Sequence, residues 1–171
     1  HLLRRFPDAL LLLAPRHPER FRPMVQLCRS YGFLTACRSE DRLARPETQC
    51  FVVDTLGELV SFCAAADVAF VAGSLDPIGG HNVLEPAALG VPVVVGPNTF
   101  NFAEVTELLV ERGACVRITD AESLASTLQR LLGQPELRRE MGSTAMAVVE
   151  AERGAAARTL EIVHRTLAGK T

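Results

Sequence analysis

The residues best suited to chemistry lie in a glycine- and proline-rich loop at positions 73–86, with the sequence G-S-L-D-P-I-G-G-H-N-V-L-E-P. Gly79 and Gly80 are adjacent and precede a helical pattern, so backbone amides there can approach an anion closely. A helix N-terminus adds a favourable dipole. The loop therefore predicts a phosphate cradle. It is neither a Walker loop nor a G-x-G-x-x-G fingerprint, because its paired glycines are adjacent and no Gly-Lys-Ser follows.

Glu85 has two interpretations. If Asn82 is the helix N-cap, Glu85 occupies N3 and completes a capping box, although Pro86 then falls at N4, where an N–H is needed. If Glu85 is itself the N-cap, Pro86 falls at the favoured N1 position and the carboxylate can hold a ribose diol. The residues leave both open. Ser74 and His81 are further candidates in this loop, and His81 is equally compatible with a structural role.

A second candidate loop contains Arg16 and His17. Pro15 and Pro18 restrict the backbone around them. A guanidinium held in this way can bind a phosphate through two parallel hydrogen bonds. The alternative for Arg16 is an ordinary surface arginine near a helix start, and for His17 the structural alternative is the stronger one.

A third loop, residues 96–104, has the sequence G-P-N-T-F-N-F-A-E. Asn101 and Glu104 have the spacing of a helix cap, so capping is the favoured role of Asn101 and ligand binding the alternative. Phe100 and Phe102 are interpreted as packing residues.

The elements that must position these loops alternate along the chain. Short apolar runs predict strands at residues 9–14, 34–37, 50–53, 68–72, 91–95 and 115–118. Between and after them, helical patterns cover residues 18–31, 56–66, 83–89, 101–112, 124–132, 137–148 and 160–167. Capping boxes are expected at Thr55 with Glu58 and at Thr119 with Glu122.

Strands without polar alternation, separated by helices, predict a parallel sheet buried on both faces. The fold class is thus α/β, a Rossmann-like doubly wound sheet, with residues 1–171 forming a single domain. Ligands of such folds bind beyond the carboxyl ends of the strands, and the three candidate loops follow strands.

Composition excludes several classes of protein. The chain has 171 residues, with 18 Lys and Arg against 20 Asp and Glu, a net charge of −2 that argues against nucleic-acid binding. Hydrophobic residues make up 48% and charged residues 22%, which excludes a disordered chain. No apolar run approaches the roughly 18–20 residues of a membrane span, and no signal peptide is visible. Five cysteines without a C-x-x-C predict reduced thiols, and no D-x-D or carboxylate cluster calls for a metal.

Five motifs together resemble one family. They are P-R-H-P-E-R-F at 15–21, D-T-L-G-E-L at 54–59, A-D-V-A-F-V-A-G-S-L at 66–75, G-G-H-N-V-L-E-P-A-A-L-G at 79–90 and G-P-N-T-F-N-F-A-E at 96–104. This series resembles the 3-deoxy-D-manno-octulosonic acid (Kdo) transferases, glycosyltransferase family 30. Residue 72 is Ala where many members have a second Gly.

The resemblance implies the C-terminal, donor-binding half of a GT-B glycosyltransferase. That family moves Kdo from CMP-Kdo to a lipid A precursor at the cytoplasmic face of the bacterial inner membrane. No cofactor is implied, and this piece alone is expected to be soluble. Transferred residue by residue, Arg16 corresponds to a phosphate or nucleotide contact and Glu85 to the ribose-binding glutamate. The donor loop corresponds to Gly79, Gly80, His81 and Asn82, with His17, Ser74 and Asn101 as lesser candidates.

The resemblance also implies parts outside this chain. The acceptor site and the acidic general base are expected in an N-terminal half, so no catalytic residue is assigned and the chain alone is expected to be inactive. A first, central strand is expected to be absent, which would leave two apolar strand edges open to self-association. The alternative functions are a GT-B domain that uses a UDP-sugar and a non-catalytic nucleotide-binding module. The number of Kdo units transferred is not encoded here.

Overall fold

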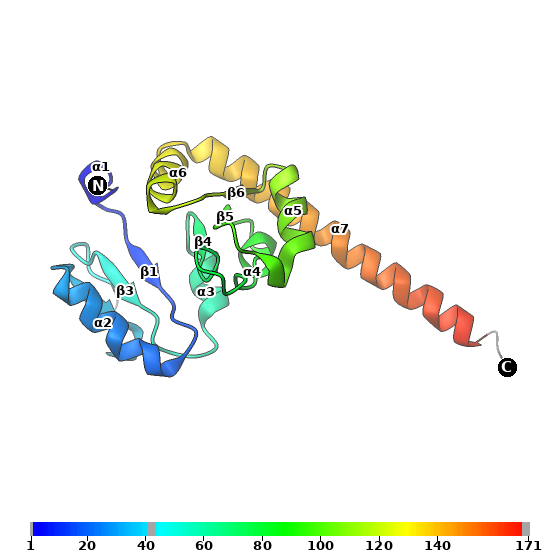
Figure 1. Cartoon of the computed structure of the whole chain (residues 1–171), viewed down its shortest axis with the longest axis horizontal. Coiled ribbons are helices and arrows are strands. Elements are labelled where there is room, and N and C mark those ends of the chain that lie inside the picture. The colour runs from blue at the N-terminus through cyan, green and yellow to red at the C-terminus, as the bar shows by residue number, and fades with distance from the viewer. Residues whose placement is uncertain (1, 41–43, 169–171) are drawn as a thin grey trace. The chain divides into compact units, whose positions relative to one another are not determined.

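The computed structural model describes residues 2–40 and 44–168, with side chains as far as residue 154. The chain divides into two compact units, His1–Ala65 and Ala66–Thr171. Each unit has its own parallel sheet. Figure 1 shows the strands and helices of both units.

The first unit is built around a parallel sheet in the order β1-β3-β2. Its elements are α1 (Leu2–Arg5), β1 (Leu11–Leu13), η1 (Pro18–Arg20), α2 (Phe21–Ser30), β2 (Thr35–Cys37), η2 (Arg38–Glu40), β3 (Cys50–Val52) and α3 (Leu59–Ala64). Leu13 and Cys37 both lie opposite Val52, so the three strands end at the same level. The segments that follow the strands therefore share one edge of this sheet.

Both faces of β3 are covered. Val25 of α2 packs with Cys37 and Val52 in one buried cluster. The ring of Phe51, the preceding residue on β3, lies 5.7 Å from that of Phe62 on α3. Because successive side chains of a strand point to opposite faces, the apolar run of β3 contacts a helix on each side.

The second unit repeats the arrangement with a parallel sheet in the order β4-β5-β6. Its elements are β4 (Ala69–Val71), α4 (Leu84–Ala88), β5 (Val93–Val95), η3 (Phe100–Phe102), α5 (Ala103–Glu111), β6 (Cys115–Arg117), α6 (Ala121–Gly133) and α7 (Pro135–Ala168). On β5, Val93 and Val95 belong to a cluster with residues of α4, α5 and α7. Val94 packs on the other face, with residues of α6 and the start of α7.

The predicted α/β class with parallel strands is confirmed, and each predicted strand is present. The strands form two sheets of three, whereas the sequence predicts one sheet. β1 and β4 are terminal strands of their sheets, each paired on one side. The single domain over residues 1–171 and the absent central strand stay predictions.

Two helix predictions are wrong in detail. The helices expected at 137–148 and 160–167 belong to one continuous helix, α7, whose side chains beyond residue 154 lie outside the described part. The box expected at Thr119 and Glu122 is displaced by one residue. Asp120 caps α6 by accepting from the Ser123 amide, and the Ser123 hydroxyl takes the reciprocal bond from the Asp120 amide.

The prediction of a capping box at Thr55 and Glu58 is also wrong. Glu58 is the N-cap residue of α3, but its side chain makes no capping bond. Its carboxylate instead accepts from the hydroxyl of Thr55 and the guanidinium of Arg38, 20 residues away. The capping-box rule considers only residues close in sequence, whereas Arg38 is distant in sequence and binds the same Glu58 carboxylate.

Candidate functional site

The glycine-rich loop follows β4, as expected, and glycine is required at its turns. Gly73, Gly79 and Gly80 have φ values of 74°, 97° and 73°. Other residues rarely adopt such angles. The Gly80 amide donates to the Gly73 carbonyl at 2.9 Å and closes the loop. Since the Gly80 N–H is used inside the loop, a ligand must be met by other amides. None of the described backbone carbonyls accepts from the Gly79 or Asn82 amides, so both suit an anion.

Ser74 is fully buried and joins two strand ends. Its hydroxyl donates to the Val71 carbonyl at 2.6 Å and accepts from the Gly96 amide at 2.8 Å. The Ser74 carbonyl accepts from the Asn98 amide at 2.9 Å. The side chain therefore fixes the carboxyl ends of β4 and β5 to each other, with its hydroxyl turned into the protein.

Asn101 clamps the paired glycines and caps no helix, so the favoured capping interpretation is wrong. Its amide nitrogen donates to the carbonyls of Ile78 at 3.1 Å and Gly80 at 3.3 Å. Its backbone N–H donates to the Gly79 carbonyl at 3.1 Å. The reason is the short helix η3, which precedes α5 and moves the helix start to Ala103.

The two phenylalanines beside Asn101 differ. Phe102 packs against the buried cluster of the second unit, which confirms its packing role. Phe100 is 64% exposed, so the same interpretation is wrong for it. Its ring lies against Gly79, where a Cβ would overlap it. Ile78, on the same loop, is 58% exposed. The candidate site thus has an apolar rim at Ile78 and Phe100.

The start of α4 follows neither interpretation of Glu85. Val83 is the N-cap residue, which places Glu85 at N2 and Pro86 at N3. Pro86 is tolerated because the amides of the first turn have no partner inside a helix. The side chain of Asn82 holds the start of α4 in place. Its Oδ1 accepts from the Leu84 amide at 2.9 Å, and its Nδ2 donates to Glu85 Oε1 at 3.1 Å. The ring of His81 folds back over Gly73.

In the first unit, Arg16 and His17 follow β1 directly. Both are exposed, and His17 has an extended backbone with φ −113° and ψ 132° just before η1. Because β1 pairs with β3 in parallel, these residues share a sheet edge with the segment that follows β3.

That neighbouring segment holds residues that the sequence alone did not assign to the site. Asp54 accepts from the Ser39 amide at 2.8 Å and from its hydroxyl at 2.5 Å. Glu58 accepts from Arg38, with Oε1 at 3.1 Å from Nη2. Hydrogen bonds from Thr55 and then from Arg38 lower the pKa of the Glu58 carboxyl, which stays ionised at neutral pH. Only the motif D-T-L-G-E-L pointed to this segment; its partners lie 15 and 20 residues away.

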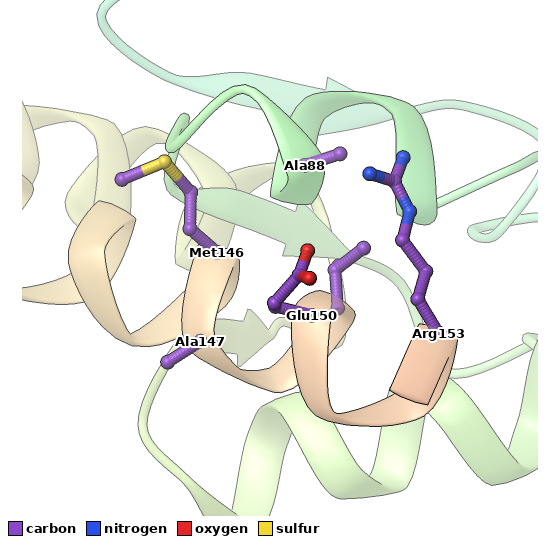
Figure 2. A pocket seen from close by; sticks show the side chains of 6 residues that line it. Ala88, Met146, Ala147, Glu150 and Arg153 are labelled. Carbon is purple, nitrogen blue, oxygen red and sulfur yellow. The ribbon is translucent and has the colours of Figure 1, made fainter. Parts of the chain in front are cut away.

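A separate hollow of about 340 Å³ lies between the end of α4 and the middle of α7 (Figure 2). It is open to solvent and lined by Ala88, Met146, Ala147, Val149, Glu150 and Arg153. None of the predicted site residues lines it, so it is not the candidate site.

Metal ligands do not cluster in the part of the chain that the structure describes. Among those residues, no group of three His, Cys, Asp or Glu side chains is placed to hold a metal ion. No described helix combines the length and hydropathy needed to cross a membrane.

Residues 37–148 match the model of the family "Glycosyl transferases group 1". A 3-deoxy-D-manno-octulosonic acid transferase of Haemophilus influenzae is 39% identical over 163 residues, which are 95% of this chain and 38% of the relative. The transferase of the same name from Bordetella pertussis is 40% identical over 156 residues, 91% of this chain and 36% of the relative. The chain thus spans less than two fifths of the length of these relatives.

Solved structures show the same similarity. The C-terminal CMP-Kdo binding domain of WaaA from Acinetobacter baumannii is 34% identical with a TM-score of 0.82, over 86% of this chain and 77% of that one. The C-terminal domain of a glycosyl transferase group 1 family protein, LpcC, from Francisella tularensis is 16% identical with a TM-score of 0.62, over 88% and 73%. This second likeness concerns the fold alone.

Proposed function

Because this chain belongs to the glycosyl transferases group 1 family and to the Kdo transferases, we propose that it is the donor-binding half of an enzyme that transfers Kdo from CMP-Kdo. Its fold is that of the C-terminal half of a GT-B glycosyltransferase. The observation that carries the proposal is the clamped Gly79-Gly80 loop, which leads into Asn82 and Glu85 at the carboxyl end of β4.

The loop has the features that an anionic donor needs. The amides of Gly79 and Asn82 are fixed groups for the donor phosphate, while Gly80, Ser74 and Asn101 position them. Such preorganised donors stabilise charge without moving as the reaction proceeds. α4 has only five residues, so the loop amides, and not a long helix dipole, carry this role.

Glu85 is the proposed ribose contact. Asn82 holds one carboxylate oxygen, Oε1, and no described residue donates to the other, Oε2. A carboxylate held on one side can accept two hydroxyl hydrogen bonds from a ribose diol. His81 and His17 are proposed as secondary contacts, and Arg16 as the cation for the phosphate.

The proposed reaction is an inverting substitution. A hydroxyl oxygen of the acceptor bonds to the anomeric carbon of Kdo, the bond from that carbon to the phosphate oxygen breaks, and CMP leaves with the electron pair. The hydroxyl proton passes to a carboxylate base outside this chain. Negative charge grows on the phosphate. Each unit offers a group suited to stabilising such charge: the amides of the glycine loop in the second unit, and Arg16 in the first.

The proposed acceptor is a lipid A precursor, and the proposed location of the whole enzyme is the cytoplasmic face of the bacterial inner membrane. Both proposals rest on membership of the Kdo transferases, whose names give neither an acceptor nor a location. The chain by itself is proposed to bind the donor without catalysing transfer, because the base and the acceptor site belong to the other half.

Replacing Glu85 by glutamine tests the ribose contact. The amide is a weaker acceptor than the carboxylate, and a hydrogen bond to a charged group is typically worth about 1.5–3 kcal/mol, so we expect affinity for CMP to fall about tenfold or more. The variant should also lose discrimination between CMP and its 2′-deoxy analogue. Isothermal calorimetry with both nucleotides measures this.

Glu104→Gln is the matched control, since Glu104 is an exposed acid in the first turn of α5. It should bind both nucleotides as the unmodified chain does. Unchanged affinity and discrimination in Glu85→Gln would contradict the ribose assignment.

The one-sided pairing of β1 within the first unit's sheet predicts association between copies of this chain. Leu10 and Leu11 are 40% and 51% exposed, and β1 pairs on one side only within its sheet. Unpaired edge groups beside apolar side chains pair readily with another chain, and a lysine there prevents it. We therefore expect a concentration-dependent dimer in light scattering that Leu11→Lys disrupts. Leu27→Lys, on α2 and also 51% exposed, should leave it unchanged. A monomer at every concentration would refute the prediction.

A further inference from the structure

The helix α2 of the first unit carries apolar residues on its exposed side. Leu27 is 51% exposed, Tyr31 at the C-cap position is 74% exposed, and Pro23 is exposed as well. Their spacing of four residues places them in one row along the helix. Large apolar side chains that gather on a surface, unlike single ones, mark a place where something binds.

This row widens the apolar side by which α2 packs on its sheet. Val25 and Cys28 are buried on that side, and Met24 packs partly buried against the cluster of the sheet. Tyr31 follows Met24 by about two helical turns and therefore lies on nearly the same line of the helix. The apolar side of α2 is thus wider than the sheet covers, and the excess faces outward.

The exposed apolar surface continues at Leu34, which is 56% exposed just before β2. The Leu34 carbonyl accepts from the Gln49 amide at 2.9 Å and from the Cys50 amide at 3.1 Å, so the residue is held against the sheet. We call the surface formed by Pro23, Leu27, Tyr31 and Leu34 the α2 face.

Positive charge is concentrated beside the α2 face. The helix contains Arg22 and Arg29, follows Arg20 and has no acidic residue. Residues 4–31 contain six arginines and two acidic residues, whereas the whole chain has 18 basic and 20 acidic residues. Arg29 pairs with Glu40 at 3.6 Å, and its side chain stays 53% exposed.

This combination suits a lipid surface. Helices that lie in a membrane interface present apolar side chains to the acyl boundary and arginines to the headgroups. A tyrosine there keeps its hydroxyl among the headgroups while its ring enters the apolar layer. The long apolar stem of an arginine lets the guanidinium reach an anionic headgroup while the helix packs below it.

We propose that the α2 face docks on an anionic phospholipid surface, with its apolar row entering the headgroup boundary and Arg22 and Arg29 binding lipid phosphates. The inference rests on the proposed membrane location of the whole enzyme and adds the surface with which the donor half itself meets the lipid. Donor binding takes no part in it. A chain that binds vesicles but fails to bind CMP would refute the proposed function and leave this inference standing.

The chain carries a direct probe of the α2 face, because Tyr31 is its one tyrosine and it has no tryptophan. We expect the chain to co-sediment with vesicles of phosphatidylethanolamine and phosphatidylglycerol. The fluorescence of Tyr31 should then be protected from acrylamide in the water and quenched by lipids with brominated acyl chains. Binding to phosphatidylcholine vesicles should be weaker, and added salt should weaken binding to the anionic vesicles.

Leu27→Glu should weaken vesicle binding about tenfold or more, because it removes an apolar anchor and adds a charge that anionic headgroups repel. Arg22→Gln should weaken it about fivefold. Val60→Glu is the matched control, since Val60 lies on α3 of the same unit and is 52% exposed, against 51% for Leu27. It should bind vesicles as the unmodified chain does.

Three results would overturn the inference. One is no binding to the anionic vesicles, or binding that leaves Tyr31 open to acrylamide. Another is an equal loss of binding in Leu27→Glu and Val60→Glu. The third is protection of Tyr31 that follows protein concentration and not lipid, which would assign the α2 face to contacts between copies of this chain.

Discussion

An enzyme carrying this chain with Arg16 replaced by alanine is expected to turn over about a hundredfold more slowly, or worse. The proposed leaving group is CMP, whose phosphate gains negative charge as the bond to the sugar breaks. One preorganised donor to such a developing charge is typically worth about 3–4 kcal/mol. The measurement is kcat at saturating donor and acceptor.

The structure supports Arg16 through its place on the sheet. It is exposed three residues after the end of β1, between Pro15 and Pro18, with the extended backbone of His17 leading into η1. These restraints reduce the entropy lost when the guanidinium is held against a phosphate.

Arg22→Ala is the control for Arg16→Ala. Arg22 is an exposed arginine in the first turn of α2, six positions along the same segment, and its loss should leave turnover near normal. If Arg16→Ala also turns over near normally, Arg16 has no role in stabilising the leaving group.

The second large effect concerns stability. Gly142→Ala should destabilise the second unit, although alanine in a helix interior is ordinarily about 1 kcal/mol better than glycine. Gly142 is buried in α7 against the end of α4, and a Cβ there would overlap the carbonyl oxygen of Gly90. Backbone atoms cannot rotate away, so the helices must separate, at a cost of about 1–3 kcal/mol.

The expected change in stability has the opposite sign to that of an ordinary Gly→Ala substitution in a helix interior. A loss of that size should lower the melting temperature by several degrees, at about 4–8 °C per kcal/mol for a unit of roughly 100 residues. Ser143→Ala, at the next and exposed position of α7, should change it little. A rise in melting temperature for Gly142→Ala would mean that the close approach of α4 and α7 does not occur.

The strands were predictable because their signal is local and strong. The valines of β5 and Leu131 of α6 are buried, and Leu124 of α6 packs partly buried against the same cluster, as their continuous and helical patterns predict. The helix caps were not predictable from spacing. Thr55 bonds to the side chain of Glu58 without capping a helix, while Glu58 and Asn101 also take partners about 20 residues away. The spacing of polar residues indicates which local hydrogen bonds are possible. The tertiary structure determines which of the possible bonds form.

Some features of the candidate site were also predictable from the sequence, and others were not. The glycine loop and Glu85 were identified from sequence, since adjacent glycines after a strand require special backbone angles. The hydrogen bonds that shape the loop could not be predicted. The Gly80 amide donates to a carbonyl inside the loop, and the buried Ser74 links the ends of β4 and β5. Arg38 and Ser39 were missed because the turn they hold is distant in sequence.

The central claim, that this chain binds the nucleotide of a CMP-activated donor, is tested most directly by melting the chain in increasing CMP, with UMP and UDP as comparisons. A ligand at about 100 times its dissociation constant adds about 2.7 kcal/mol of stability. For a domain of this size that raises the melting temperature by roughly 5–10 °C. We predict this rise with CMP and a much smaller one with UMP or UDP. A larger rise with UDP, or none with any of the three, would contradict the claim.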